Sequence, residues 1–299
     1  MPERVLVVGA GVIGLSCAVR LLGAGHRVDV LARDLPLETT SSVAAAIWYP
    51  YLALPRDRVV AWGRATYDEC VRLAGVEGSG VVMRRGTELL RERTPDPWWV
   101  EAVPALERVA PRAPYHDAWS FVTPVIEMPV YLAWLAGRVR DGGGTITRMA
   151  MARLPEGPLV VNCSGLGSRG LAQDTTTTPV RGQVVVVEQI GLREWWLADQ
   201  GPTYVVPRSA DIVLGGTDDA GEWDRRPSPE VAEDIVRRAT DLVPELAPAR
   251  VLRHQVGLRP ARPAVRLERV GDVIHCYGHG GAGVTLSWGC ADEVASLAR

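Results

Sequence analysis

Residues 5–14 read Val-Leu-Val-Val-Gly-Ala-Gly-Val-Ile-Gly, and this stretch decides the predicted fold. The four apolar residues predict a short buried strand, and the glycines that follow have the spacing G-x-G-x-x-G. The first glycine of that pattern permits a tight turn, the second lets backbone approach a pyrophosphate, and the third lets a helix pack on the strand. A helix over 12–22, whose N-terminal amides favour phosphate, and a strand over 26–31 would complete a β-α-β unit.

The end of the second predicted strand carries two charged candidates for a ribose contact. Asp34 lies 20 residues after Gly14, near the position expected for a ribose-binding acid. Arg33 precedes it, and its charge would suit a 2′-phosphate if it took the strand-end position instead. The motif predicts a dinucleotide site, with a tight turn that binds nothing as the alternative.

A second glycine-rich stretch, Tyr-Gly-His-Gly-Gly-Ala-Gly, covers residues 277–283. Two nucleotide-contacting segments at opposite ends of one chain indicate a long cofactor lying across the fold, and FAD is the natural candidate. A nicotinamide-dependent dehydrogenase would also use residues 5–14, but it would leave residues 277–283 unexplained.

Composition narrows the choice of function. The 299 residues allow two domains or one large one, and a hydrophobic content of 47% is ample for a packed core. A net charge of −2 argues against a nucleic-acid-binding footprint, which would be basic. All 33 basic residues are arginine, so no lysine Schiff base or lysine general base is available. Anions must be recognised by arginine or by backbone amides.

Five scattered cysteines form no C-x-x-C pair, which indicates buried, reduced thiols in a cytoplasmic protein. The sequence shows no signal peptide, and no apolar run is long enough to predict a membrane-spanning helix. His275 and His279 are four residues apart, but the glycines between and after them argue against a helical metal pair, so no metal is expected.

The rest of the chain alternates between helices and strands. Helices are predicted over 56–75, 128–140, 229–240 and 286–298, and strands over 159–162, 184–188 and 212–214. Residues 94–118 are expected to form turns and short pieces, and further turns are expected at 142–144 and 175–178. Small residues at 163–167, directly after a buried strand, would let a flat ligand approach closely.

Several ordered segments resemble the FAD-dependent D-amino-acid oxidase family over nearly the whole chain. The most specific are Val-Ile-His-Cys-Tyr-Gly-His-Gly-Gly-Ala-Gly at 273–283 and Gly-Leu-Arg-Pro-Ala-Arg-Pro at 257–263. Residues 7–16, 39–51, 161–165, 181–183 and 288–291 also match, whereas Cys276 departs from the family pattern.

The resemblance implies an α/β fold with two domains. A Rossmann-like FAD-binding domain of the glutathione-reductase type is expected over 1–48, 133–182 and 262–299. A substrate-binding domain built on a mixed or antiparallel sheet is expected over 49–132 and 183–261, with that sheet covering the flavin.

The implied reaction is the oxidative deamination of a D-amino acid. Hydride passes from Cα to non-covalently bound FAD, and 2-oxo acid, ammonia and hydrogen peroxide follow. Arg259 is the expected carboxylate anchor, since a guanidinium offers two parallel donors. Tyr204 matches a tyrosine that donates to the same carboxylate, and the backbone carbonyl of Gly281 matches a group facing the amine. Tyr51 matches a pocket tyrosine, and Tyr49 replaces a frequent glutamine; packing at a domain seam is the alternative for both.

The resemblance and the two glycine motifs together give the set of expected FAD-binding residues. These are Gly9, Ala10, Gly11, Val12, Ile13, Gly14, Arg33, Asp34, Thr40, Ser41, Ser42, Ala45, Ala46, Ile47, Cys163, Ser164, Gly165, Gly182, Gln183, Gly278, Gly280, Gly281, Ala282, Gly283, Val284 and Thr285. The expected partners are a D-amino acid, O₂ and a second copy of the chain in a homodimer, without nucleic acid or membrane.

Two departures from the family bear on substrate choice. Asp218 and Asp219 stand where D-aspartate oxidases place an arginine, so neutral or basic D-amino acids are expected over acidic ones. Gln200 replaces the tyrosine of a mobile lid, so little or no lid is expected. A glycine- or sarcosine-type amine oxidase, a D-aspartate oxidase and a non-catalytic flavin-binding scaffold remain as alternatives.

Overall fold

The computed structural model describes residues 3–199 and 201–299, and it begins with the β-α-β unit that the sequence predicts. Strand β1 (Arg4–Val8) is followed by helix α1 (Val12–Gly23) and strand β2 (Arg27–Ala32). β1 pairs in parallel with β2 on one side and with β7 (Leu159–Asn162) on the other. Its valines are almost completely buried, as the uninterrupted apolar run predicts.

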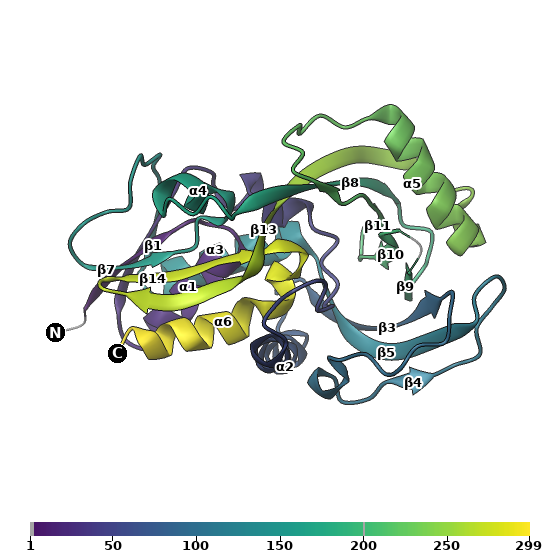
Figure 1. Ribbon diagram of the computed structural model, residues 1–299, viewed down its shortest axis with the longest axis horizontal. Helices are drawn as coiled ribbons and strands as arrows, with labels where there is room; N and C mark the ends of the chain where they lie inside the picture. Colours follow the sequence, from purple (N-terminus) through teal and green to yellow (C-terminus); the bar gives the residue numbers. More distant parts are fainter. Residues whose placement is uncertain (1–2, 200) are drawn as a thin grey trace.

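One half of the molecule is a parallel sheet in the order β14-β7-β1-β2-β6. Figure 1 labels β14, β7 and β1 of this sheet. Strand β6 (Thr145–Arg148) forms its edge, and β14 (Val273–His279) leads into helix α6 (Gly283–Leu297). Helix α1 packs against α6 and against α3 (Met128–Asp141), and α6 also packs against α2 (Arg56–Leu73). The largest apolar core fills the space between these helices and the sheet.

The other half is mainly antiparallel. It contains β3 (Val81–Leu90), β4 (Glu107–Arg108), β5 (Asp117–Ile126), β9 (Trp195–Ala198), β10 (Thr203–Pro207), β11 (Asp211–Gly215) and the short β12 (Asp219–Ala220). Helix α5 (Pro229–Leu242) packs on β8, β10 and β11, and Ser228 caps its first turn by accepting from the amide of Val231. A second hydrophobic core lies in this half, and the aromatic side chains of Trp48, Trp99, Phe121 and Trp195 are at its centre.

Two long strands, β8 (Thr178–Glu188) and β13 (Val251–Val270), connect the halves. They pair with each other from Ala261–Thr178 to Val251–Val187, and β13 then continues as the antiparallel partner of β14. The domain boundaries expected at 182/183 and 261/262 therefore fall inside continuous strands, and the division into domains stays a prediction.

Most of the predicted elements are confirmed within a few residues, including all four further helices, of which the last, α6, begins at Gly283 rather than at residue 286. The expected turn at 175–178 is wrong at its last residue, because β8 already begins at Thr178. The long strand β13 was expected nowhere, since glycine and prolines interrupt its sequence. The lid substitution at Gln200 lies outside the described residues. Among the described residues, no helix is both long enough and apolar enough to cross a membrane.

Candidate active site

The N-terminal glycine motif forms a close turn in which side chains have no room. Gly9 has φ +113°, and a Cβ added there would lie 2.4 Å from the carbonyl oxygen of Cys163. A Cβ at Gly14 would lie 2.0 Å from the carbonyl oxygen of Gly9. Strand, turn and helix are therefore in direct backbone contact, which is the arrangement that lets helix-terminal amides approach a phosphate.

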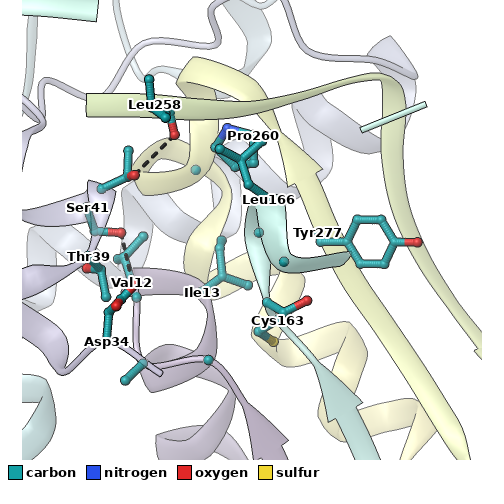
Figure 2. Close-up of a pocket in the computed structure, with 18 of the residues that line it drawn as sticks. Val12, Ile13, Asp34, Thr39, Ser41, Cys163, Leu166, Leu258, Pro260 and Tyr277 are labelled. Carbon is teal, nitrogen blue, oxygen red and sulfur yellow. Dashed lines mark hydrogen bonds between the residues drawn. The ribbon is translucent and has the colours of Figure 1, made fainter. Parts of the chain in front are cut away.

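A cavity of about 710 Å³ extends from this turn to the side chains of Arg259 and Tyr204. In Figure 2, Val12 and Ile13 from α1, Cys163 after β7, and Leu258 and Pro260 from β13 surround this pocket. The cavity is lined mainly by apolar groups, with the glycine turn before α1 at one end, which fits a long, flat cofactor with its phosphates near α1.

Many of the expected cofactor residues line this cavity, from both glycine motifs and from the segments between. They are Gly9, Ala10, Gly11, Val12, Ile13, Arg33, Asp34, Thr40, Ser41, Cys163, Ser164, Gly165, Gly182, Gly280, Gly281, Gly283 and Val284. The other expected cofactor residues are not part of this lining: Gly14, Ser42, Ala45, Ala46, Ile47, Gln183, Gly278, Ala282 and Thr285. Gln183, for example, is fully buried and its side-chain amide donates to the carbonyl of Ser228.

Hydrogen bonds connect the loop before α2 with α1 and with β13, which lie on different sides of the cavity. The backbone amide of Val12 donates to Ser41 Oγ at 3.1 Å, a bond drawn in Figure 2. The hydroxyl of Thr40 donates to the carbonyl of Leu258 at 3.1 Å. These two bonds fix residues 40–41 between α1 and β13, where the sequence resemblance placed cofactor contacts.

The ribose candidates lie together at the far end of the cavity. Arg33 Nη2 and Asp34 Oδ2 are 2.6 Å apart, and this ion pair lowers the pKa of Asp34. The loop after β12 also reaches the cavity through Trp223 and Arg225, which were not expected. Trp223 stands between Glu222 and Asp224 in the sequence and is 52% exposed, and neither feature marks it as a cavity residue.

Beneath the turn after β7, an asparagine and a histidine form a buried pair. Asn162 Oδ1 accepts from both the amide and the hydroxyl of Ser164, at 3.2 and 2.6 Å. The Asn162 side-chain nitrogen lies 3.3 Å from His275 Nδ1. Burial lowers the pKa of His275 to about 4, so this imidazole is neutral near pH 7. The pair shapes the turn that carries Cys163 and Ser164, and His275 is directed to Asn162 rather than to His279.

Arg259 extends along the backbone of β8. A Cβ added at Gly182 would lie 2.5 Å from Cζ and both terminal nitrogens of its guanidinium. Nη1 donates to the carbonyl of Thr217 at 2.8 Å. The side chain is partly buried and has no carboxylate in an ion pair with it among the residues described. Its charge is therefore available to an anion in the cavity.

Tyr204 lies beside Arg259, and its ring packs on the backbone of another glycine, Gly215. A Cβ at Gly215 would be 1.8 Å from Cζ of the Tyr204 ring, so only glycine leaves space for the ring. Burial raises the pKa of the Tyr204 hydroxyl, and the charge of Arg259 opposes that rise. The phenol is consequently a neutral hydrogen-bond donor next to a fixed positive charge.

Gly281 lines this end of the cavity, whereas Tyr51 is absent from the lining and lies directly behind Gly281. A Cβ at Gly281 would stand 3.1 Å from Cδ1 of Tyr51 and 3.6 Å from Cδ of Arg259. The Tyr51 hydroxyl donates to Asp218 Oδ2 at 3.3 Å. Burial raises the pKa of Tyr51, and the Asp218 carboxylate adds to that rise.

Tyr49 is directed elsewhere. Its hydroxyl donates to both carboxylate oxygens of Glu88, at 3.0 and 3.1 Å, and its ring packs edge-on against Trp99. It is absent from the lining of the cavity. Of the two interpretations considered for Tyr49, this position favours packing between the sheet and the loop before α2.

The family model described as FAD dependent oxidoreductase matches residues 4–297. The chain is 47% identical to a D-amino-acid oxidase of Rubrobacter xylanophilus, over 99% of this chain and 95% of that protein. It is 35% identical to a human D-aspartate oxidase, over 98% and 94% of the two chains. Its fold is similar to that of a glycine oxidase from Geobacillus kaustophilus, with a TM-score of 0.84, 21% identity and coverage of 99% and 95%. The chain therefore belongs to the family of FAD-dependent oxidoreductases that contains these D-amino-acid and D-aspartate oxidases.

Proposed function

We propose that this enzyme oxidises neutral and basic D-amino acids with O₂, giving 2-oxo acid, ammonia and hydrogen peroxide. The observation that carries the proposal is one continuous cavity, which has the glycine turn of α1 at one end and Arg259 with Tyr204 at the other. A cofactor bound along the cavity would thus end beside a built carboxylate site. The 47% identity to a D-amino-acid oxidase supports the same substrate class.

Arg259 and Tyr204 would bind the substrate carboxylate together. The guanidinium supplies charge and two donors, and the neutral phenol supplies a third donor from the side. Gly182 and Gly215 hold both groups at fixed height above the sheet, because neither side chain can move closer to the backbone. Such fixation orders the substrate before reaction, and orientation alone lowers the barrier of a bound reaction.

The remaining groups would orient the amine and exclude water. The carbonyl of Gly281 is the proposed acceptor for the amine, which is reactive in its neutral form. FAD, when bound, supplies the redox chemistry by accepting the hydride from Cα. Within this scheme no side chain of the enzyme needs to take the α-proton, and the protein acts by binding, orientation and desolvation.

We further propose that FAD is bound without a covalent bond. The cavity offers backbone amides of residues 9–13, the Ser41 and Thr40 region and the charged pair at the end of β2 for this purpose. Unfolding the protein in acid and filtering it should release all of the yellow flavin. Colour retained on the chain would contradict this part of the proposal.

Substrate choice is assigned to Asp218. Its carboxylate accepts from Tyr51, while the neighbouring Asp219 is 3.1 Å from the guanidinium of buried Arg181. Asp218 has no cationic partner among the described residues. Asp218 is absent from the lining of the cavity and would act from beside Tyr51, so its charge would repel an acidic side chain in the pocket and attract a basic one. A D-aspartate oxidase activity is therefore disfavoured.

The decisive experiment mixes the purified protein with D- and L-amino acids in the absence of oxygen and follows flavin absorbance. Bleaching by D- but not L-enantiomers is expected, fastest with neutral or basic side chains. Bleaching only by glycine or sarcosine would replace the proposal by an amine oxidase. A yellow protein that no amine bleaches would indicate a flavin-binding scaffold.

Two expectations about the environment of the enzyme belong to the same proposal. Five unpaired buried cysteines suit a reducing compartment such as the cytoplasm. A homodimer is expected from the family resemblance, and light scattering coupled to gel filtration would distinguish it from a monomer.

A further inference from the structure

Four cysteines that are far apart in the sequence meet in the core of the parallel half. Cys17 lies on α1, Cys163 follows β7, Cys276 lies on β14 and Cys290 lies on α6. Each is at most 8% exposed, and we call these four residues the thiol cluster. Cys163 Sγ and Cys17 Sγ are 3.9 Å apart.

The thiol cluster contains two overlapping sets of metal-ligating groups. The Sγ atoms of Cys17, Cys163 and Cys276 lie within 4.8 Å of one another. Cys276, Cys290 and a ring nitrogen of His279 form a second set of the same compactness. Cys276 belongs to both sets. His279 is 4% exposed, and its Nε2 has no hydrogen-bond partner among the described residues.

We propose that the thiol cluster binds one thiophilic metal ion of the Zn²⁺ class, with Cys276 as the ligand that every arrangement requires. Thiolate ligands select Zn²⁺ and Cu⁺ over harder ions. With Zn–S bonds of about 2.3 Å, the edge of a tetrahedron is roughly 3.8 Å, and the observed separation of 3.9 Å matches it. The sulfurs therefore need little movement to become ligands.

Charge and protons balance in such a site. A fully buried site must be close to neutral, and two thiolates neutralise one divalent cation. On binding, two S–H bonds break, two metal–sulfur bonds form, and two protons pass to the buffer. A neutral His279 imidazole can add a third ligand beside Cys276 and Cys290, and any thiol that keeps its proton stays outside the coordination sphere.

Through Cys276 the ion would connect β14 either with α1 and the turn after β7 or with α6, and these elements border the cofactor cavity. Cys163, Cys276 and His279 line that cavity, so the metal would stabilise the turn after β7 and the start of α6 from behind. Because the cluster is buried, we expect loading while the chain folds rather than by diffusion into the finished enzyme.

The test measures metal directly. The holoenzyme is produced in cells grown with added Zn²⁺, passed over a chelating resin, and analysed for zinc per chain; a parallel preparation with Cd²⁺ is examined for cadmium–thiolate absorbance in the ultraviolet. We expect about one ion per chain. Cys276→Ala should lose the ion, because Cys276 belongs to both sets. At least one of Cys17→Ala and Cys290→Ala should lose it too, according to which set holds the ion, and neither residue touches the cavity.

Cys70→Ala is the matched control, because Cys70 is equally buried but lies on α2, outside both sets. It should keep the ion. A wild-type holoenzyme free of zinc and cadmium would overturn the proposal, as would equal loss from Cys70→Ala. A drop of two in the count of free thiols without bound metal would overturn it in favour of a disulfide. If Cys276→Ala does not fold, the Cys17 and Cys290 variants decide the question.

Discussion

The guanidinium of Arg259 rests on the backbone of Gly182, so closely that a Cβ there would lie 2.5 Å from three of its atoms. The two residues are on neighbouring strands, β13 and β8, where Gly182 pairs with Gly257 and Arg259 with Val180. The carboxylate anchor of the proposed site thus depends on a residue that has no side chain. Gly182 is expected to contact the cofactor, and the absence of a Cβ at this position also leaves room for the Arg259 guanidinium.

Gly182→Ala should therefore impair substrate binding more than folding. The added methyl must displace the guanidinium, and overpacking of this kind costs about 1–3 kcal/mol. If that cost falls on substrate binding, KM for D-alanine rises roughly 5- to 100-fold while the protein remains yellow. Steady-state kinetics with D-alanine and a flavin spectrum measure both quantities.

Gly137→Ala in α3 is a suitable control for this variant, because a Cβ there has no atom within 4 Å. It should leave KM unchanged and slightly favour the helix. An unchanged KM in Gly182→Ala would show that Arg259 does not bind the substrate carboxylate from its observed position.

Tyr204→Phe tests the second donor of the same site. The ring remains on Gly215, and only the hydroxyl is removed. Loss of one hydrogen bond to a charged group costs about 1.5–3 kcal/mol, so kcat/KM should fall by about one to two orders of magnitude. Most of the change should appear in KM, because the proposed bond is present in both the ground and transition states. A fall in kcat alone would instead assign the hydroxyl to the chemical step.

The local part of this architecture could be predicted from the sequence. A glycine pattern, a buried strand and a helix lie within residues 4–23, so their interactions are between near neighbours and leave a readable pattern. The same holds for α5, whose cap and apolar side are contained in one segment. The resemblance to a known family adds the expectation for Arg259 and Tyr204, which both lie at the same end of the cavity.

The long-range part could not be predicted in this way. Cys17 and Cys163 are 146 residues apart, and no spacing rule relates them. Strand β13 was missed because Pro260 and Pro263 are poor strand residues; the structure places them where β13 leaves β8 and joins β14, so a missing amide costs little there. Gly215 under Tyr204 is a similar case, since its requirement for glycine arises only from β10–β11 pairing.

Asp218→Asn should change the choice of substrate. Asp218 is exposed and its interaction with a cationic side chain is screened, so its contribution is about 0.5–1 kcal/mol. Relative to D-alanine, kcat/KM for D-arginine should fall about 2- to 5-fold, and D-aspartate should improve by a similar factor. Competition assays with the three substrates measure these ratios. Asp219→Asn removes the same charge one residue away, beside Arg181, and should leave the ratios unchanged.

Glu88 should make stability depend on pH in a predictable direction. Burial raises the pKa of its carboxyl from 4.5 to about 7 in the folded protein. The unfolded chain releases this proton near pH 4.5, so unfolding becomes progressively easier as pH rises from about 4.5 to about 7, with no further change from this group above that range. The difference between the two pKa values corresponds to roughly 3 kcal/mol.

Glu88→Gln removes this cost, because the amide is neutral at every pH and can still accept from the Tyr49 hydroxyl. The variant should match the wild type near pH 4 and exceed it in the free energy of unfolding by an increasing margin up to about pH 7. Denaturant titrations at several pH values measure the margin, and Glu156→Gln, on an exposed side chain, serves as the control. A margin that stays constant with pH would mean that Glu88 is already ionised in the folded protein at pH 4.5.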